Sequence, residues 1–341
     1  MNGLILNGPR DLALTRLDDP GDPGPGEARV RIRRCGICGT DISAYLGRLP
    51  FIRYPRVPGH ELAVTIEAVG DGVPHLKPGD AAAVEPYLTC GHCPPCRAGR
   101  TNCCSHLQCF GVHCDGGLRE AVVLPAGKLH PAHDLGLDQL ALVEMLGIGK
   151  HAVDRAGTRA GDTVAVIGLG PIGLTAVQFA RLKGARVVGV DLNADRCGQA
   201  RTLFEGLDTL AFDPDQGLAA TWDARESERP WLVFDATGNR RSVETAIALP
   251  GNGGSVVSIG IFDGAVTYDG PEFHRREISL LASRNSTADD FREIIDALRS
   301  GAIATEPWIT HRAALAEVPA AFPGWLAPAA GCIKAMVSLD D

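Results

Sequence analysis

The sequence lacks any apolar run of the roughly 18–20 residues that a membrane-spanning helix needs, so we expect no membrane partner. No basic segment stands ahead of an apolar stretch near Met1, and we expect no secretory signal peptide. Basic residues are not in excess, because 33 Lys and Arg against 41 Asp and Glu give a formal charge of −8. This balance argues against a general affinity for nucleic acids. Internal repeats and low-complexity tracts are also missing.

The length of the chain and its high cysteine content are informative. Its 341 residues suggest about two domains, with a core large enough that disulfides are not needed for stability. Eleven cysteines, an odd number in a long chain, are not typical of a secreted disulfide framework. We therefore expect a reduced, cytoplasmic protein whose thiols are available to bind metal.

The pattern of predicted secondary structure changes near residue 147. Before it, short β-type runs predict a compact β unit with a long loop inserted at about 86–116. After it, strands alternate with helices, which predicts βαβ units around a parallel sheet and an α/β fold class. Further on, Thr287 predicts the N-cap of a helix. The predicted strands are 28–33, 62–69, 81–84, 163–167, 186–191, 231–235, 255–259 and 332–339, and the predicted helices lie after 173 through 183, at 194–204 and after Thr287.

A glycine fingerprint stands between the predicted strand 163–167 and the helix that follows it. Gly168 permits a tight turn, Gly170 lets the backbone approach a pyrophosphate, and Gly173 allows helix and strand to pack closely. Asp191 ends the next predicted strand, where its carboxylate can accept hydrogen bonds from the adenosine ribose, and this favours NAD over NADP. The alternative is an ordinary glycine turn with a surface aspartate. The fingerprint reads Gly168-Leu169-Gly170-Pro171-Ile172-Gly173.

Arg196 lies five residues after Asp191 and is the one hint of tolerance toward the 2′-phosphate of NADP. The alternative is a solvated helix residue that does not contact the cofactor.

Four cysteines lie within fifteen residues, at Cys90, Cys93, Cys96 and Cys104. Four thiolates at this spacing can surround a tetrahedral zinc and leave no open position, which predicts a structural metal. An oxidised disulfide pair and an iron–sulfur cluster are the alternatives. Cys103 neighbours the last ligand, so the register there is open by one residue.

Other candidate metal ligands lie outside this lobe, and each of them taken singly is weak evidence for a metal site. Cys38, His60, Glu61 and Glu144 have side chains suited to zinc. A lone histidine is more often a structural residue, and Cys35 with Cys38 is also compatible with a redox pair or half of a zinc knuckle.

In combination these motifs resemble the zinc-dependent medium-chain alcohol dehydrogenases, and more closely their polyol and sugar dehydrogenase branch. The resemblance covers nearly the whole chain. Its motifs are Cys35-Gly36-Ile37-Cys38-Gly39-Thr40-Asp41, Gly59-His60-Glu61, the four-cysteine lobe, Gly79-Asp80, and the glycine fingerprint with Asp191.

The resemblance implies a split GroES-like β-rich catalytic domain at 1–146 and 285–341, with the structural-zinc lobe at about 86–106. It implies a Rossmann domain with a doubly wound parallel sheet at 147–284, which binds NAD. The active site is expected in the cleft between the domains. Relatives are dimers or tetramers, so a homo-oligomer is expected.

The resemblance also implies a second, catalytic zinc with Cys38 and His60 as ligands and Glu61 beside the metal. Glu144 stands at the third-ligand position, and in the polyol branch this carboxylate often reaches zinc through water. Direct binding by Glu144 is not fixed by the sequence. One thiolate in place of two makes the zinc a stronger Lewis acid.

The implied reaction is the oxidation of an alcohol, in which zinc lowers the pKa of the alcohol and nicotinamide accepts the hydride. Thr40 is placed to accept a hydrogen bond from the alcohol and pass its proton outward, and the alternative is a mere turn hydroxyl. Many relatives carry a histidine three positions later. Here that position is Ser43, so the final group of the proton relay stays unassigned.

Substrate contacts are predicted in the segment 47–58, which lies near the substrate cleft in this family. We hypothesise that an arginine there recognises a carboxylate or several hydroxyls, as in a sugar acid or polyol. The alternative is a solvated loop. The candidate residues in this segment are Arg48, Arg53 and Arg56, which stand with the aromatic Phe51. Ser43 and Tyr45 ahead of the segment are further candidates, and so are Arg284 and Asn285, beside cofactor and substrate.

We therefore predict an NAD-dependent zinc enzyme that oxidises a secondary alcohol of a polyol, sugar or sugar acid. A threonine-type or simple-alcohol dehydrogenase of the same family is the alternative. A non-catalytic nucleotide-binding regulator is a distant one, because such proteins usually lose the ligands that are present here.

Overall fold

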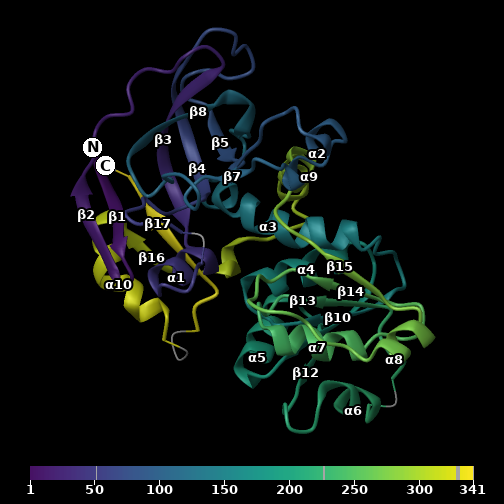
Figure 1. Ribbon diagram of the computed structural model, residues 1–341. Helices are drawn as coiled ribbons and strands as arrows, with labels where there is room; N and C mark the ends of the chain where they lie inside the picture. Colours follow the sequence, from purple (N-terminus) through teal and green to yellow (C-terminus); the bar gives the residue numbers. More distant parts are fainter. Residues whose placement is uncertain (51, 226, 328–330, 341) are drawn as a thin grey trace. The chain divides into compact units, whose positions relative to one another are not determined.

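The computed structural model describes residues 1–50, 52–225, 227–327 and 331–340 (Figure 1). The chain divides into two compact units. Unit 1 comprises Met1–Met145 and Thr287–Asp341, and unit 2 comprises Leu146–Ser286. The first boundary therefore falls inside helix α3 (Leu137–Arg155).

Unit 1 is built on a seven-stranded sheet with the order β16-β17-β3-β4-β5-β9, in which β8 also pairs with β3. Figure 1 shows the C-terminal β17 in yellow beside the purple β3, and the two strands are antiparallel. A separate hairpin joins β1 to β2. The strands are β1 (Asn2–Gly8), β2 (Asp11–Arg16), β3 (Glu27–Gly36), β4 (Glu61–Val69), β5 (Ala81–Val84), β8 (Ala121–Pro125), β9 (Leu129–Pro131), β16 (Ile309–Ala314) and β17 (Lys334–Ser338).

Strand β3 shows why the alternating sequence forms a half-buried strand. Val30 and Ile32 are fully buried on the core face. On the other face, Nε of Arg29 lies 2.9 Å and Nε of Arg31 lies 2.7 Å from the carboxylate of Glu67 on β4. The alternation of apolar and basic residues thus places each side chain in a suitable environment.

Short elements occupy the remainder of unit 1. The long loop predicted at 86–116 contains two short strands, a helix and a 3₁₀ turn. Helix α9 begins after the N-cap Thr287, as predicted, and Thr287 and Asp290 form a capping box. The elements are α1 (Gly39–Tyr45), β6 (Tyr87–Leu88), α2 (Pro94–Arg97), η1 (Thr101–Cys103), β7 (Gln108–Cys109), η2 (Ala126–Lys128), α9 (Ala288–Arg299), η3 (Glu306–Trp308), η4 (Leu315–Glu317) and α10 (Val318–Trp325).

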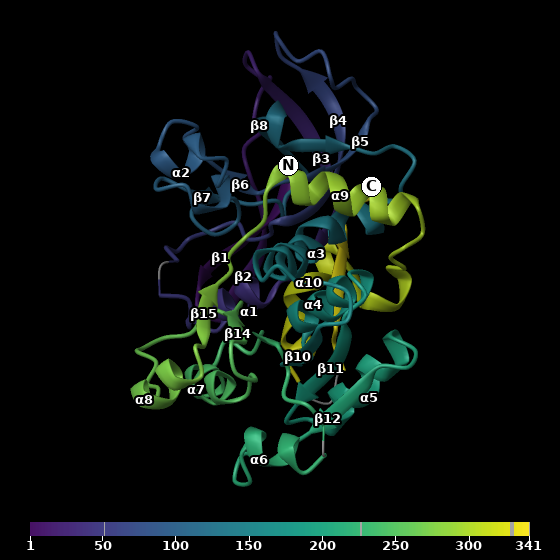
Figure 2. The same ribbon diagram turned by 90° about the vertical axis from the view of Figure 1, so that its right-hand side faces the viewer.

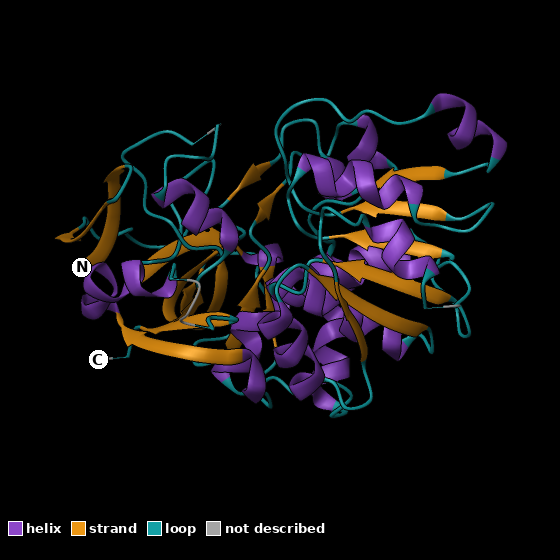
Figure 3. Ribbon diagram, turned by 90° about the horizontal axis from the view of Figure 1, so that it is seen from below, coloured by secondary structure: helices purple, strands orange, loops and turns teal. Residues whose placement is uncertain are grey.

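Unit 2 is a parallel six-stranded sheet with the order β12-β11-β10-β13-β14-β15. Figure 3 shows helices on both sides of these strands, and Figure 2 shows α5 beside β11 and β12. Starting from β10, this order is the doubly wound 3-2-1-4-5-6 arrangement. The elements are β10 (Thr163–Ile167), α4 (Pro171–Leu182), β11 (Arg186–Asp191), α5 (Ala194–Leu203), β12 (Asp208–Ala211), α6 (Leu218–Asp223), β13 (Leu232–Asp235), α7 (Arg240–Ala248), β14 (Ser255–Ser258), α8 (Gly270–Arg275) and β15 (Ser279–Ala282).

The central strands of this sheet are covered on both faces, and Ala165, Val166, Val233 and Val256 are fully buried. Such burial explains their continuous apolar runs. The α/β fold class and the two kinds of sheet are as predicted. Within the described residues, no helix has both the length and the apolar content needed to cross a membrane.

Candidate active site and metal centres

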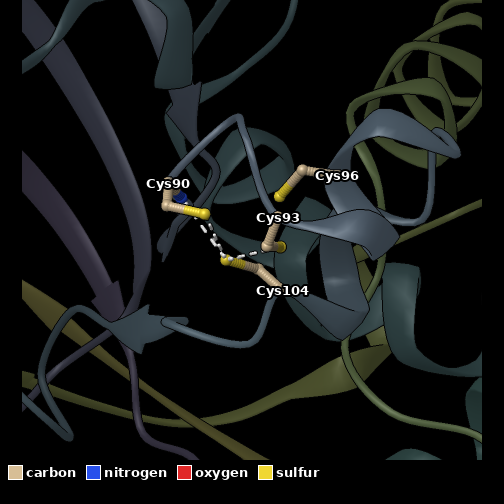
Figure 4. A group of neighbouring side chains, drawn as sticks. All are labelled: Cys90, Cys93, Cys96 and Cys104. Carbon is tan, nitrogen blue, oxygen red and sulfur yellow. Dashed lines mark hydrogen bonds between the residues drawn. The ribbon is translucent and has the colours of Figure 1, made fainter.

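The four-cysteine lobe lies between β6 and β7. Cys93 caps the start of α2, Cys96 lies within it, and Cys104 follows η1. The sulfur atoms of the four cysteines all lie within 4.8 Å of one another. Figure 4 shows Cys104 joined to Cys90 and to Cys93, with Sγ–Sγ distances of 3.5 and 3.8 Å. A tetrahedral zinc with Zn–S bonds of about 2.3 Å separates its sulfurs by about 3.8 Å. The residues therefore fit a closed zinc site.

Backbone N–H groups point at these sulfurs. The Sγ atom of Cys104 accepts hydrogen bonds from the N–H of Cys90 at 3.3 Å and of His106 at 3.4 Å. Backbone donors lower the pKa of the Cys93 thiol to about 5. This favours the thiolate, which is the form that binds metal. Cys103 lies in η1 and is not part of the group.

A second, smaller group forms at one edge of the unit 1 sheet. The ligand atoms of Cys38, His60 and Glu61 lie within 4.8 Å of one another. Cys38 caps α1, and Glu61 is the first residue of β4. Gly59 has a φ of +98°, and a Cβ there would lie 2.8 Å from Sγ of Cys35. The turn that presents His60 therefore requires glycine.

Asp41 orients the backbone around this group, a role that the sequence analysis did not assign. Its carboxylate accepts hydrogen bonds from the N–H of Cys38 at 3.0 Å and of Gly59 at 3.2 Å. One carboxylate oxygen also lies 3.8 Å from Nδ1 of His60. Burial opposes protonation of the imidazole, but the negative charges of Asp41 and Cys38 raise the pKa of His60 above its usual value.

Glu61 is paired with a lysine that the sequence analysis missed. Nζ of Lys334, from β17, lies 2.6 and 2.7 Å from the two carboxylate oxygens and donates to the carbonyl of Ile37 at 3.0 Å. Both side chains are buried, with 2% exposure for Lys334 and none for Glu61. Burial opposes the charge on Lys334, but Glu61 raises the pKa of its ammonium. Glu61 therefore has a buried cationic partner on the side away from solvent.

Glu144 is not within the group of three. It lies buried in α3, where its carboxylate accepts a hydrogen bond from the hydroxyl of Tyr87. Tyr87 is another residue that the sequence alone did not single out. Burial raises the pKa of the Glu144 carboxyl. Cys35 is also outside the group, and its side chain is fully buried in β3.

The predicted relay and substrate residues differ in exposure. Thr40 and Ser43 are half-buried in α1. Tyr45 is buried, and its ring packs against Phe322 with a centroid distance of 4.7 Å. Phe51 lies outside the described residues. Arg48 and Arg53 are exposed.

Arg56, in contrast, is half-buried and makes contacts within unit 1. Its Nη1 lies 3.0 Å from the carboxylate of Asp115, and its backbone bridges to Leu6. These contacts give Arg56 a structural role.

The glycine fingerprint forms the first turn after a parallel strand in unit 2. Gly168 has a φ of +89°, and a Cβ on Gly173 would lie 1.7 Å from the carbonyl oxygen of Gly168. Gly170 caps the 12-residue helix α4 without a side-chain hydrogen bond, and Pro171 and Ile172 begin its first turn. The helix therefore offers backbone N–H groups to an anion beside Gly170, which has no side chain to block the approach.

Asp191 lies beside this turn at the end of β11. Its carboxylate accepts hydrogen bonds from the N–H of Leu169 at 2.8 Å and of Asn193 at 2.9 Å. Arg196 is close by, with Nη1 at 3.9 Å from a carboxylate oxygen of Asp191. A Cβ on Gly170 would lie 3.8 Å from the same nitrogen. The structure thus brings Arg196 and Asp191 to the fingerprint.

The segment after β15 contains unsatisfied polar groups. Oγ of Ser283, Nδ2 of Asn285 and Oγ of Ser286 are buried without a hydrogen-bond partner. Arg284, between them, is exposed. Buried polar groups are normally paired, so this segment departs from the usual pattern.

Two family models match the chain. The Alcohol dehydrogenase GroES-like domain matches residues 24–134, and Zinc-binding dehydrogenase matches residues 171–300. The chain is 40% identical to L-galactonate-5-dehydrogenase of Escherichia coli (strain K12), over 93% of this chain and 94% of that protein. This chain belongs to the zinc-dependent medium-chain alcohol dehydrogenases, in their polyol and sugar branch. The dehydrogenase is thus an enzyme of alcohol or polyol oxidation.

Solved structures share the whole fold of the dehydrogenase. An alcohol dehydrogenase from Escherichia coli CFT073, complexed with NADH, has a TM-score of 0.92 at 29% identity and covers 99% of both chains. A zinc-binding dehydrogenase from Sinorhizobium meliloti 1021, bound to NADP, has a TM-score of 0.89 at 30% identity and covers 99% of this chain and 98% of that chain. These two neighbours therefore differ in the cofactor they hold.

Replacing Lys334 with methionine should destabilise the dehydrogenase strongly. Lys334→Met leaves the buried Glu61 carboxylate without its cation, and losing one partner of a buried pair costs about 3–5 kcal/mol. Urea unfolding measures the loss. The double variant Glu61→Gln with Lys334→Met is the control and should recover part of the stability. A loss below about 1 kcal/mol in Lys334→Met would mean that the pair is weak.

Proposed function

We propose that this dehydrogenase uses NAD and two zinc ions to oxidise a secondary alcohol of a sugar acid or polyol to the ketone. The observation that carries the proposal is the convergence of Cys38, His60 and Glu61 at one edge of the unit 1 sheet, with Glu144 buried nearby in α3. A single thiolate with nitrogen and carboxylate donors suits a zinc site that keeps an open position.

The chain's own residues prepare this site before any chemistry occurs. Cys38 and His60 would hold the catalytic zinc, and Asp41 fixes the backbone on both sides through its two N–H contacts. Lys334 neutralises Glu61. Zinc would supply the positive charge that lowers the pKa of an alcohol, and the nicotinamide would accept a hydride. Thr40 offers a hydroxyl oxygen that can accept the alcohol's proton and relay it outward.

The proposal places the dinucleotide on unit 2, with its phosphates on the N–H groups at the start of α4. Asp191 supports NAD as the cofactor. Each of its carboxylate oxygens accepts one backbone hydrogen bond and has further lone pairs for ribose hydroxyls. A 2′-phosphate would meet this negative charge. Arg196 lies close enough to moderate the discrimination.

Two exposed arginines support a carboxylate-bearing substrate. Arg48 and Arg53 lie just after α1, the helix that Cys38 caps. Within the described residues, their guanidinium groups form no ion pair, so they are available to a substrate carboxylate. The 40% identity with L-galactonate-5-dehydrogenase, a sugar-acid enzyme by name, points the same way.

Two further observations support the proposed location and oligomeric state of the enzyme. All eleven cysteines are free thiols, which supports a reducing cytoplasm. Strand β15 ends its sheet, and Leu280 on it is 40% exposed, which supports a homo-oligomer, either a dimer or a tetramer.

A screen of NAD reduction tests the substrate class. We expect turnover of sugar acids such as L-galactonate, or of polyols, in preference to threonine and simple alcohols. Arg48→Ala or Arg53→Ala should raise KM for the sugar acid about tenfold, since a charge-assisted hydrogen bond is lost, and leave an uncharged polyol unaffected. Arg292→Ala, on the exposed face of α9, is the control. Preference for threonine or a simple alcohol would overturn the proposal.

The ratio of kcat/KM for NAD to that for NADP tests the role of Asp191. We expect the wild-type ratio to favour NAD, and Asp191→Ala to reduce it about tenfold or more because the ribose contacts and the repulsion are both lost. Glu205→Ala, an exposed carboxylate after α5, should leave the ratio unchanged. A wild-type preference for NADP would contradict the assignment.

Metal analysis tests the two zinc sites separately. The purified enzyme should contain about two zincs per chain. Cys38→Ser should retain about one zinc and lose activity, whereas Cys93→Ser should lose the structural metal and lower the melting temperature. Cys103→Ser, one residue from a ligand, should keep both metals. Equal metal loss in Cys103→Ser and Cys93→Ser would show that the ligand register is wrong.

A further inference from the structure

Two buried carboxylates of unit 1 lie near Cys38 and His60, and each is held by a different residue. Both oxygens of Glu61 are bound by a buried lysine ammonium, at 2.6 and 2.7 Å. Glu144 instead accepts a hydrogen bond from the hydroxyl of Tyr87. The ligand atom of Glu61 lies within 4.8 Å of those of Cys38 and His60, and Glu144 is not part of this group. The contact that keeps Glu144 out of the group therefore sets how many ligands a bound metal would have.

Glu144 is nevertheless close enough to act on the group. Burial lowers the pKa of His60, and neighbouring negative charges, that of Glu144 among them, raise it above its usual value. Glu144 is itself buried, so its carboxylate cannot turn out into water. Zinc accepts carboxylate oxygen as a ligand, and its charge would attract a carboxylate at this place. A contact with the protein is therefore needed to keep Glu144 apart from a bound metal.

The position of Tyr87 is fixed by main-chain contacts that do not involve Glu144. Strand β6 pairs with β7 through Tyr87 and Cys109. The N–H of Phe110 also donates to the carbonyl oxygen of Pro86, at 2.9 Å. The tyrosine ring is buried, so its hydroxyl has little freedom to move. The phenol is therefore a fixed donor, and the longer and more flexible side chain of Glu144 comes to it.

A buried cluster of charged groups anchors the chain just before Tyr87. The carboxylate of Glu85 lies 2.5 Å from Nζ of Lys128 and 3.2 Å from Nε2 of His130. The N–H of Glu85 donates to the carbonyl oxygen of Lys128 at 2.8 Å. The ring of His130 stacks on Phe291 of α9, with a centroid distance of 4.9 Å. These contacts hold the segment 85–87 in place on the side away from β7.

We propose that Tyr87 is a positioning residue that holds the carboxylate of Glu144 aside, so that the catalytic zinc site keeps one open position. The inference rests on the proposed function, because it requires a zinc at this site. A catalytic zinc has three protein ligands and one open position, whereas four protein ligands make a closed, structural site. Cys38, His60 and Glu61 already supply three donor groups. Glu144 would be the fourth ligand and would close the site.

Retention of zinc by the purified enzyme in competition with a chelator tests the proposal, and the four-cysteine zinc is the internal reference. Tyr87→Phe removes only the hydroxyl and should retain the catalytic zinc about tenfold more tightly, because Glu144 joins its ligands. The same variant should lower kcat about tenfold or more, because the open position is filled. Adding Tyr87→Phe to Glu144→Gln should change zinc retention less than threefold, because the released carboxylate is missing. Tyr268→Phe, at a half-exposed tyrosine of unit 2, is the control and should match the wild type.

Glu144→Gln alone decides the matter if thermal melting shows that Tyr87→Phe is not folded. It should weaken zinc retention less than tenfold, and a larger loss would make Glu144 a direct ligand and overturn the proposal. Unchanged zinc retention in a folded Tyr87→Phe would overturn it as well. Weaker retention in this variant, both with and without Glu144→Gln, would give Tyr87 a structural role only. A wild-type enzyme that lacks the catalytic zinc would refute the proposed function, and this inference with it.

Discussion

The register of three neighbouring strands determines where the candidate catalytic residues lie. On β3, Gly36 pairs with Glu61 of β4 on one side and with Met336 of β17 on the other. Cys38 follows the end of β3, and Lys334 begins β17 two residues before Met336, so all of these groups come to one edge of the sheet. A shift of one residue in either pairing would turn Glu61 or Lys334 to the opposite face. The hydrophobic alternation that buries Val30 and Ile32 thereby also fixes where the candidate metal ligands lie.

This placement concentrates negative charge in a buried region. Cys38, Asp41, Glu61 and Glu144 are acidic groups, and Lys334 is the basic side chain that neutralises one of them. Burial raises the pKa of Asp41 and of Glu144, which means that their charged forms lack sufficient compensation from the protein alone. A divalent cation would offset this surplus. The charge of the site and the types of its donor atoms therefore both favour a divalent metal ion.

Local patterns predicted the elements and motifs that depend on local sequence. Strands β10 and β11 have the predicted bounds, because each is a short apolar run between turn residues. Helix α3 was missed because residues 140–145 are all buried, and a stretch that is buried on every side shows no amphipathic period. The edge strands β12 and β15 are short and half-exposed, so they lack a strong apolar signal. The four clustered cysteines could be recognised from their spacing in the sequence. Lys334 and Tyr87 could not, because they contact Glu61 and Glu144, which lie 273 and 57 positions away, and no local pattern indicates such contacts.

Helix α4 gives the two edges of the unit 2 sheet opposite electrostatic character. At the edge where the strands end, α4 begins, and its unpaired N–H groups and positive dipole end suit phosphates without any charged side chain. At the other edge α4 ends, and the negative end of its dipole disfavours an anion. Arg181 lies in the last turn of α4, where a cation is favoured, and it donates to the carbonyl oxygen of Glu205 at 2.8 Å. The dipole of α4 is thus consistent with a glycine turn at its first end and with Arg181 at its last.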